Sequence, residues 1–441
     1  MDTREIKLRQ SFSADAQIQT LRLGFDKIDD HRSKAGTVSI SDALMSGFAM
    51  FSLKDPSLLA FDERRVVDEN LKKIYKITNV PSDTQMRTIL DDIDPKIISE
   101  SFNDIFRIAQ RGKLLEKYVF LNGWYLISID GTGHFSSKDI HCNSCLEKTN
   151  SEGETTYHHQ ILAATIIHPD IKEVIPMPPE PIIKQDGDNK NDCERNATKR
   201  FFENLRKDHP HLPIIVVEDG LASNAPHIAE LKKHNLHFIL GAKEGDHQYL
   251  FNHIADAAKN GLVTDIIFEK DGAIVRIRFI NNVPLNESNQ NTRVNFMECW
   301  ETKKDRTQHF SWVTDIEITK ENAFQIMRGG RARWKIENET YNTLKNQGYH
   351  FEHNYGHGYK NLSVVFVFLM MLAFLVDQIQ QLACPLFRAV FDKCNHNKRS
   401  LWDKMRSLFA CLEFDSMESI FKAMLYGYNR KGIIIIINSP T

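Results

Sequence analysis

The sequence predicts an α/β fold whose core is interrupted by an antiparallel β insertion, with helical regions before and after it. Three observations support this prediction: helical periodicity up to about residue 120, an ordered series of strands and helices over 121–258, and alternating polarity over 259–318. With 441 residues the chain is too long for one ordinary core. The predicted regions are 1–120 helical, 121–258 first part of the core, 259–318 insertion, 319–385 second part of the core, and 386–441 helical, with a possible role in oligomerisation.

The N-terminal region contains helix-forming residues at amphipathic spacing in 39–53 and 61–77. A further helix is expected after Pro81, with Ser82 or Asp83 as its N-cap. A helix, a short turn and a polar helix are compatible with a unit that reads DNA. A plain helical bundle explains the same pattern.

The order of elements over 121–258 is β-β-β-α-β-α-β. Apolar runs at 124–133 and 212–220 indicate strands, and the second is nearly continuous, as in a central parallel strand. The other expected elements are strands at 156–168, 172–179 and 236–243, a turn at 168–170, and helices at 193–210 and 225–235. Three antiparallel strands followed by parallel ones match a ribonuclease H-like fold.

The segment 259–318 alternates apolar and polar residues around an Asp271–Gly272 turn, which predicts antiparallel strands. Helix then returns, capped by Thr319, broken at Gly329–Gly330 and ended by Gly348. Beyond 386 the pattern is helical, and the isoleucine run at 433–437 is expected to pair or pack, because an exposed run would promote aggregation.

Composition indicates a soluble globular protein, with 41% hydrophobic and 26% charged residues. The apolar run 362–376 is shorter than the roughly 20 residues of a membrane span, so we interpret it as a buried helix. Seven scattered cysteines and an N-terminus without an apolar signal segment favour the cytoplasm. A net charge of −2 decides nothing about DNA binding, because local patches make phosphate contacts.

Two aspartates follow apolar strands. Asp130 ends the run in 124–130, and Asp219 ends the run in 212–219. In the expected sheet the first and fourth strands are neighbours, so their carboxyl ends bring both aspartates together. Glu218 is a poorer candidate, since alternation turns it to the opposite face. Carboxylates that hold two divalent metal ions can move a phosphodiester. For either aspartate alone, an ordinary turn is the simpler interpretation.

The third carboxylate is expected on a helix packed against the sheet. Glu337 lies four residues after Arg333 and shares its helical face. Glu339 points elsewhere, and Glu352 lies beyond the helix. A surface ion pair also explains the Arg333–Glu337 spacing.

The order Asp130, Asp219, β insertion, Glu337 resembles the DDE transposases of bacterial insertion sequences, in the group with a Tyr-x2-Arg-x3-Glu-x6-Lys signature. Arg333-x3-Glu337 fits it. Gly330 stands at the tyrosine position, and Leu344 at the lysine position with Lys345 next. Lys345 lies about 80° around the helix from Glu337, within reach of a phosphate.

The resemblance implies that Asp130, Asp219 and Glu337 bind two Mg²⁺ ions, for which Mn²⁺ can substitute, and that Arg333 and Lys345 bind DNA phosphates. Trp300 and Trp312 could stack on a flipped base, with core packing as the alternative. It further implies recognition of terminal inverted repeats by the N-terminal helices, target DNA as a second partner, a homodimer on paired ends, no membrane, and a nucleoid-associated protein of the bacterial cytoplasm.

Three other segments carry chemistry-bearing residues. Cys142 and Cys145 could bind zinc with a further ligand such as His158, His159 or Cys193, although unliganded thiols are the default. The loop 354–361 could contact phosphate, or serve as a turn into the buried helix. The acidic segment 184–195 lacks the closing glutamate of a calcium loop, so a solvated loop before a helix is expected.

The function predicted is metal-dependent cleavage at element ends and strand transfer into target DNA. A DNA-binding descendant without catalysis is one alternative, and a ribonuclease H-like nuclease without joining activity is another.

Overall fold

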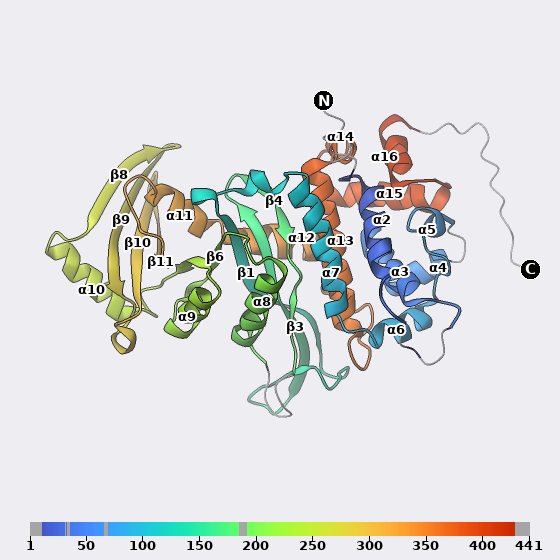
Figure 1. Cartoon of the computed structure of the whole chain (residues 1–441), viewed down its shortest axis with the longest axis horizontal. Helices are drawn as coiled ribbons and strands as arrows, with labels where there is room; N and C mark the ends of the chain where they lie inside the picture. The colour runs from blue at the N-terminus through green and yellow to red at the C-terminus, as the bar shows by residue number, and fades with distance from the viewer. Residues whose placement is uncertain (1–10, 31, 33–35, 66–68, 185–191, 428–441) are drawn as a thin grey trace, which may run out of the picture.

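A computed structural model describes residues 11–30, 32, 36–65, 69–184 and 192–427. The described chain is a mixed α/β protein with one 11-stranded sheet. Helices gather at one end of the elongated molecule, and the strands of the insertion form the other end (Figure 1). The isoleucine run at 433–437 lies outside the described residues.

The centre of the sheet has the pairing order predicted for 121–258. Strand β1 (Tyr125–Ser137) pairs antiparallel with β3 (Thr155–His168) and parallel with β6 (Ile214–Glu218). Beyond these, β4 (Ile171–Pro176) pairs with β3, and β7 (His237–Gly241) pairs parallel with β6. The first and fourth strands of the predicted series are therefore neighbours.

The expectation that the first strand ends at Asp130 is wrong. Strand β1 runs on to Ser137, because β3 continues to pair with it beyond Asp130, through a bulge between Gly133 and Phe135. Its parallel pairing with β6 stops at Ser128 opposite Val217. Asp130 thus lies in mid-strand, but just past the point where the parallel part of the sheet ends.

Two short strands and one helix were not predicted. Strand β2 (Leu146–Thr149) and strand β5 (Glu180–Ile182) both pair with β3. Helix α10 (Gln248–Lys259) leads into the insertion. The two predicted helices of the core are α8 (Glu194–Asp208) and α9 (Ala225–Lys233).

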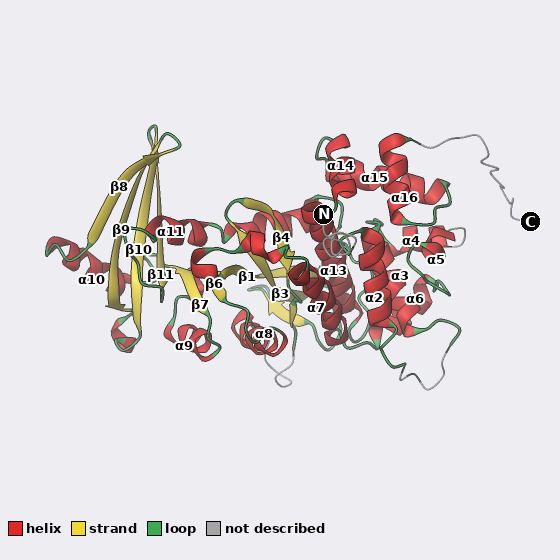
Figure 2. Ribbon diagram, turned by 45° about the horizontal axis from the view of Figure 1, so that its top comes forward, coloured by secondary structure: helices red, strands yellow, loops and turns green. Residues whose placement is uncertain are grey.

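The insertion extends the core sheet instead of forming a sheet of its own. Its last strand, β11, pairs antiparallel with β7 of the core. The turn at Asp271 and Gly272 has positive φ at both residues, as expected for a tight hairpin. Figure 2 shows these strands at the end of the molecule opposite the helical end. They are β8 (Thr264–Lys270), β9 (Ala273–Pro284), β10 (Arg293–Lys303) and β11 (Arg306–Thr314).

Helices from both ends of the chain pack around α13 (Leu362–Ala383). The capping box that Ser82 forms with Gln85 confirms Ser82 as the N-cap of α6. The N-terminal helices are α2 (Ala14–Phe25), α3 (Ile40–Ser52), α4 (Leu58–Arg65), α5 (Glu69–Lys73), α6 (Asp83–Asp91) and α7 (Lys96–Arg111). The C-terminal ones are α14 (Pro385–Lys393), α15 (Lys398–Cys411) and α16 (Met417–Tyr426).

Helix α13 is longer than the apolar run that marks it. It has 22 residues, because the polar segment after Val376 stays helical, so the argument that the segment is too short to span a membrane is wrong. By length and composition α13 could cross a bilayer, yet its apolar window is 100% buried inside the protein. It contacts α3, α7 and β4, which makes it the core helix that joins the helical end to the sheet.

Gly329 and Gly330 do not break the helix in which they lie. Both belong to α11 (Ala323–Arg331), and the interruption comes at residues 332–333. A Cβ at Gly330 would overlap the indole of Trp312, so the glycine permits close packing. The chain then forms a π-helical turn, η5 (Ile336–Tyr341), and helix α12 (Asn342–Asn346).

Candidate active site

Asp130 and Asp219 occupy matching positions relative to two paired strands, Asp130 within β1 and Asp219 directly after the last residue of β6. Ser128 is paired with Val217, and each aspartate stands two residues further along its own strand direction. Because side chains alternate along a strand, both aspartates project from the same face of the sheet. Asp219 Oδ1 accepts a hydrogen bond from the backbone N–H of Leu221 at 2.9 Å, which fixes its carboxylate at the start of the following turn. Both line one cavity of about 520 Å³.

The Asp130 carboxyl lies in a partly buried acidic environment. Burial is the largest cause that raises its pKa, to about 6, and the nearby carboxylates of Glu194 and Glu337 raise it further. The Arg333 guanidinium opposes this rise. The three carboxylates carry more negative charge than the single Arg333 guanidinium can offset. This excess of negative charge favours the binding of a metal cation.

The π-helical segment is tied directly to the strand that carries Asp130. The Tyr341 hydroxyl donates to the main-chain oxygen of Asp130, and the Ser128 hydroxyl donates to the main-chain oxygen of Arg333 at 3.1 Å. These bonds hold Glu337, on the same segment, beside the sheet. A single turn of π-helix of this kind is frequent at functional sites.

Of the three glutamates that could complete the site, Glu337, Glu339 and Glu352, Glu337 lies beside Asp130. Its carboxylate is 2.8 Å from Arg333 Nη1 and is 49% exposed. Glu352 instead pairs with Lys345 at 2.8 Å. Glu339 lies away from the aspartates. Burial lowers the pKa of Lys335 and of Lys398, and the Glu339 carboxylate opposes this lowering.

A fourth carboxylate, which was missed at the sequence level, also enters the site. Glu194 begins α8, lines the cavity with Asp130 and Asp219, and lies over Gly131. Burial raises its pKa, and the Asp219 and Glu218 carboxylates add to the rise. The sequence did contain a signal for Glu194. A helix that precedes a parallel strand runs opposite to it, so the first residues of α8 lie at the edge of the sheet where β6 ends. Residues 185–191, the rest of the acidic loop, lie outside the described residues.

Glu218 serves a different purpose from its neighbour Asp219. Its Oε2 lies 2.6 Å from His227 Nε2. Burial alone would lower the pKa of His227, but the Glu218 carboxylate raises it above its usual value. Glu218 is therefore engaged in a buried ion pair.

A second cavity, of about 580 Å³, adjoins the first at Asp219. It is lined by residues of the core, of β11 and of the segment that follows α11. Its cationic and aromatic side chains include Lys243, His309, Trp312, Arg333 and Trp334.

The three tryptophans near this cavity differ in availability. Trp312 is 6% exposed and packs against Gly330. Trp300 stacks on His309 with ring centroids 4.8 Å apart, and two arginines, Arg276 and Arg278, lie over its ring. Trp334, which the motif comparison did not single out, is 54% exposed.

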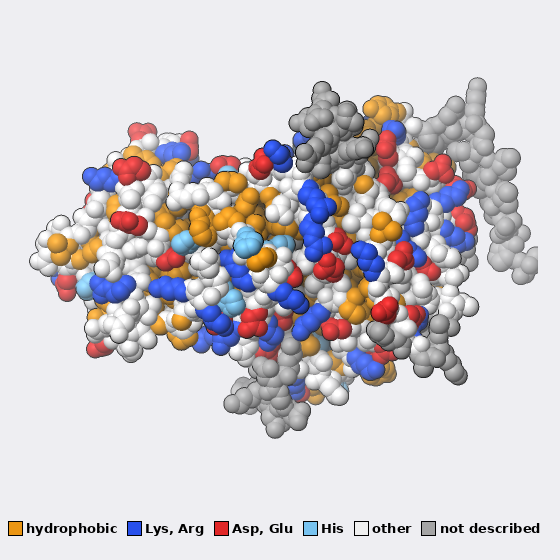
Figure 3. Space-filling view, in the orientation of Figure 1, with side chains coloured by type: hydrophobic (Ala, Val, Ile, Leu, Met, Phe, Trp, Pro, Cys, Tyr) orange, Lys and Arg blue, Asp and Glu red, His pale blue; other side chains and the backbone are white. Residues whose placement is uncertain are grey.

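Basic side chains continue from the site along the insertion. A groove of about 500 Å³ is lined by five basic residues, Lys270, Lys303, Arg328, Arg331 and Lys335, and by three acidic ones, Asp170, Asp271 and Glu301. Arg328 pairs with Asp170, and Arg331 pairs with Glu301. On the face drawn in Figure 3, lysines and arginines surround an area near the middle where hydrophobic side chains and histidines are exposed. Lys345 lines none of these three cavities, since it turns to Glu352, while its neighbour Leu344 is buried.

The donor set suits a hard divalent cation. Asp130, Asp219, Glu194 and Glu337 offer carboxylate oxygens, which Mg²⁺ and Mn²⁺ prefer. Their arrangement is open. Among the described residues, the ligand atoms that converge within 4.8 Å of one another belong to cysteines and histidines elsewhere, and these four carboxylates do not converge so tightly. An open set leaves room for water and substrate phosphate, which Mg²⁺ normally retains.

No family model matches the chain, and no curated protein matches its sequence. Among solved structures, this chain is similar to a piggyBac transposase in a synaptic complex with hairpin DNA. The aligned part covers 96% of this chain and 80% of the piggyBac chain. The identity is 10% and the TM-score 0.39.

Proposed function

We propose that this protein is a DNA transposase of the DDE kind, which cleaves the ends of a mobile element and joins them to target DNA. The observation that carries the proposal is the register of β1 and β6, which puts Asp130 and Asp219 each two residues beyond the pair Ser128 and Val217. Glu337 and Arg333 lie beside Asp130. A ribonuclease H-like core accounts for the strand order on which this geometry depends.

The acidic residues would hold two divalent metal ions, which would activate the attacking oxygen and offset charge on the leaving oxygen when bound. Asp130 and Asp219 are the inner pair, one within β1 and one directly after β6. Arg333 holds Glu337 in place and adds positive charge near the scissile phosphate. The hydrogen bonds from Ser128 and Tyr341 keep the helical segment at a fixed distance from β1.

The DNA would run through the cavity at Asp219 and along the basic groove of the insertion. Lysine and arginine side chains there suit contacts with the phosphate backbone, which dominate nucleic-acid affinity. Lys345 would reach a phosphate only after leaving Glu352. We expect the N-terminal helices to read the terminal repeats and a homodimer to pair the ends, in the cytoplasm of a bacterium that carries the insertion sequence.

The test is strand cleavage and joining by purified protein on DNA that carries the repeats flanking its gene, with Mg²⁺ or Mn²⁺. Asp130→Asn and Asp219→Asn should each abolish cleavage while leaving end binding intact. Asp256→Asn, on the exposed side of α10, is the matched control. Cleavage at the normal rate by either site variant would refute the assignment.

The same assay separates the two alternatives. A DNA-binding descendant would bind ends and cleave nothing, even with Mn²⁺. A nuclease without joining activity would cut but leave no product joined to target DNA.

A further inference from the structure

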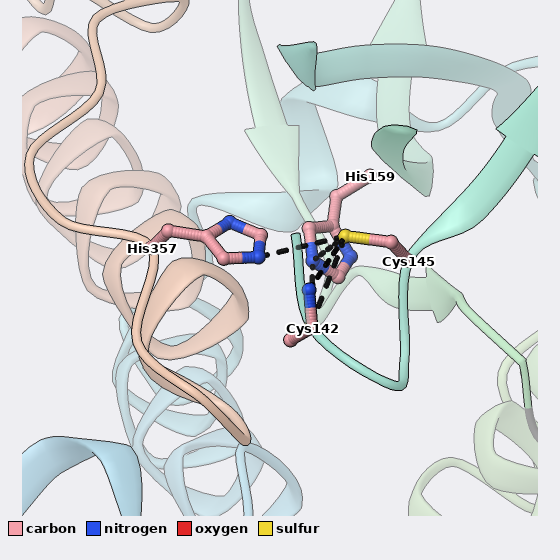
Figure 4. Close-up of side chains that lie close together, drawn as sticks. All are labelled: Cys142, Cys145, His159 and His357. Atoms are coloured by element: carbon pink, nitrogen blue, oxygen red, sulfur yellow. Dashed lines mark hydrogen bonds between the residues drawn. The ribbon is translucent and has the colours of Figure 1, made fainter. Parts of the chain in front are cut away.

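Two cysteines and two histidines from three parts of the chain converge outside the acidic site. Cys142 and Cys145 lie in the loop between β1 and β2, His159 lies on β3, and His357 lies in the loop before α13 (Figure 4). The four ligand atoms all lie within 4.8 Å of one another. The sequence offered His158, His159 and Cys193 as further ligands beside Cys142 and Cys145. Of these, His159 belongs to the cluster, whereas His158 and Cys193 do not.

Four of the six distances between the ligand atoms are close to the edges of a small tetrahedron. The two Sγ atoms are 3.9 Å apart, and His159 Nε2 lies 3.6 Å from Cys142 Sγ and 3.4 Å from Cys145 Sγ. His357 Nε2 is 3.5 Å from Cys145 Sγ. Tetrahedral zinc with ordinary Zn–S and Zn–N bond lengths requires ligand separations of about 3.4–3.8 Å.

Burial makes this convergence unfavourable without a metal ion. Cys145 and His159 are each 1% exposed and His357 is 7% exposed. The two Sγ atoms and the two Nε2 atoms are partnered mainly by one another, through weak contacts between sulfur atoms and between sulfur and nitrogen. Buried polar groups with such poor partners are costly.

Aromatic rings pack around the cluster, and backbone hydrogen bonds order the turn from Cys142 to Cys145. The Phe135 ring packs on His357 with centroids 4.3 Å apart, and His134 stacks on His159. The backbone N–H of Cys142 donates to Cys145 Sγ at 3.4 Å, and the N–H of Cys145 donates to the main-chain oxygen of Cys142.

We propose that Cys142, Cys145, His159 and His357 bind one structural Zn²⁺ ion. Two thiolates and two imidazoles in a tetrahedral arrangement are a donor set selective for zinc. Four protein ligands leave no open coordination position, which distinguishes this closed site from the open acidic one. Cys145 and His357 are 212 positions apart, so the spacing is not that of a zinc finger.

The zinc would fix the segment that follows the proposed catalytic helix. His357 lies between α12 and α13, and the next residues are held by Asp91, whose carboxylate accepts from four consecutive backbone N–H groups, Tyr359 to Leu362. Asp91 thus takes the place that a phosphate would need at these groups, which favours the turn interpretation of the loop 354–361. Zinc and Asp91 would together anchor this loop to the sheet and to α6.

The direct test is metal analysis of the full chain purified without added metal. We expect one zinc per chain by mass spectrometry. After chelation, added Co²⁺ should give the intense visible bands of a tetrahedral ion and a thiolate charge-transfer band. Protein that contains no zinc and takes up neither Zn²⁺ nor Co²⁺, or that has a Cys142–Cys145 disulfide, would overturn the proposal. This measurement uses the unaltered chain, so it does not depend on the folding of a variant.

Variants then assign the ligands. Cys145→Ser and His357→Asn should each weaken zinc binding by at least about 100-fold, beyond the cost of losing a second-shell partner. Cys411→Ser, at an exposed cysteine, and His353→Asn, in the same loop as His357, are matched controls that should keep the metal. Retention of tight zinc binding by His357→Asn would contradict the four-ligand site.

Discussion

The carboxylate of Glu194 lies directly over Gly131, so close that a Cβ at position 131 would overlap its Oε1 atom. A side chain at position 131 would therefore push the Glu194 carboxylate from the place that it holds in the acidic site. The role of Gly131 is thus specific: it leaves space for a fourth carboxylate, which the linear order Asp130, Asp219, Glu337 does not reveal.

Gly131→Ala should displace Glu194 and lower cleavage activity while leaving DNA binding unchanged. The reason is steric, because the overlap is with a side-chain carboxylate that can move away at the cost of its position. Gly245→Ala, where a Cβ would meet nothing within 4 Å, is the matched control and should be neutral. Wild-type cleavage rates for Gly131→Ala would show that the position of Glu194 does not matter.

Glu337→Gln and Glu194→Gln decide which glutamate completes the metal-binding set. We expect Glu337→Gln to reduce cleavage at least about 100-fold, more than the loss of a second-shell partner costs, and Glu194→Gln to reduce it less. The order follows from Glu337 being exposed and held by Arg333, whereas Glu194 is more enclosed. Single-turnover cleavage at several Mg²⁺ concentrations measures this. The reverse order would make Glu194 the third ligand.

Metal-free protein should become less stable as pH rises from about 4 to about 6. Burial raises the pKa of Asp130 from 3.8 to about 6, so in this range the unfolded chain is ionised while the folded chain still holds the proton. Folding then opposes ionisation, and stability is lost with increasing pH. Asp130→Asn removes this cost and should raise the free energy of unfolding by about 1 kcal/mol at pH 7.5, a figure reduced for partial exposure.

Urea unfolding in the presence of a chelator, at pH 4 and pH 7.5, measures this difference. The stabilisation by Asp130→Asn should disappear at pH 4, and added Mg²⁺ should stabilise the wild type more than the variant. Equal stability of the two proteins at both pH values would show that the Asp130 carboxyl is not strained by its surroundings.

Trp334→Ala should weaken binding to cleaved-end DNA without lowering stability. Trp334 is exposed in the cavity at Asp219, and stacking on a base is worth about 1–3 kcal/mol. Trp300→Ala should instead lower stability, since its ring already contacts His309, Arg276 and Arg278. Fluorescence anisotropy in Ca²⁺ gives the affinities and thermal unfolding gives the stabilities. Unchanged affinity for Trp334→Ala would remove it as a stacking residue.

The sequence alone determined the local elements and the strand order of the core. Alternating or continuous apolar runs predicted β1, β3, β4, β6 and β7 and the hairpins of the insertion, because these patterns record which faces are buried. Strand order then placed Asp130 and Asp219 on neighbouring strands. Among the glutamates, helical phase relative to Arg333 favoured Glu337, which is the one that lies beside Asp130.

Only the tertiary structure decided how far elements extend and which distant residues meet. Strand β1 passes Asp130 because β3 pairs with it there. Helix α11 runs through both glycines, where Phe120 and Ile239 lie against Gly329 and Trp312 lies against Gly330. Glu194 reaches the acidic site, and His357 completes the cysteine–histidine cluster. These outcomes depend on contacts between segments far apart in the chain, and local periodicity carries no information about such contacts.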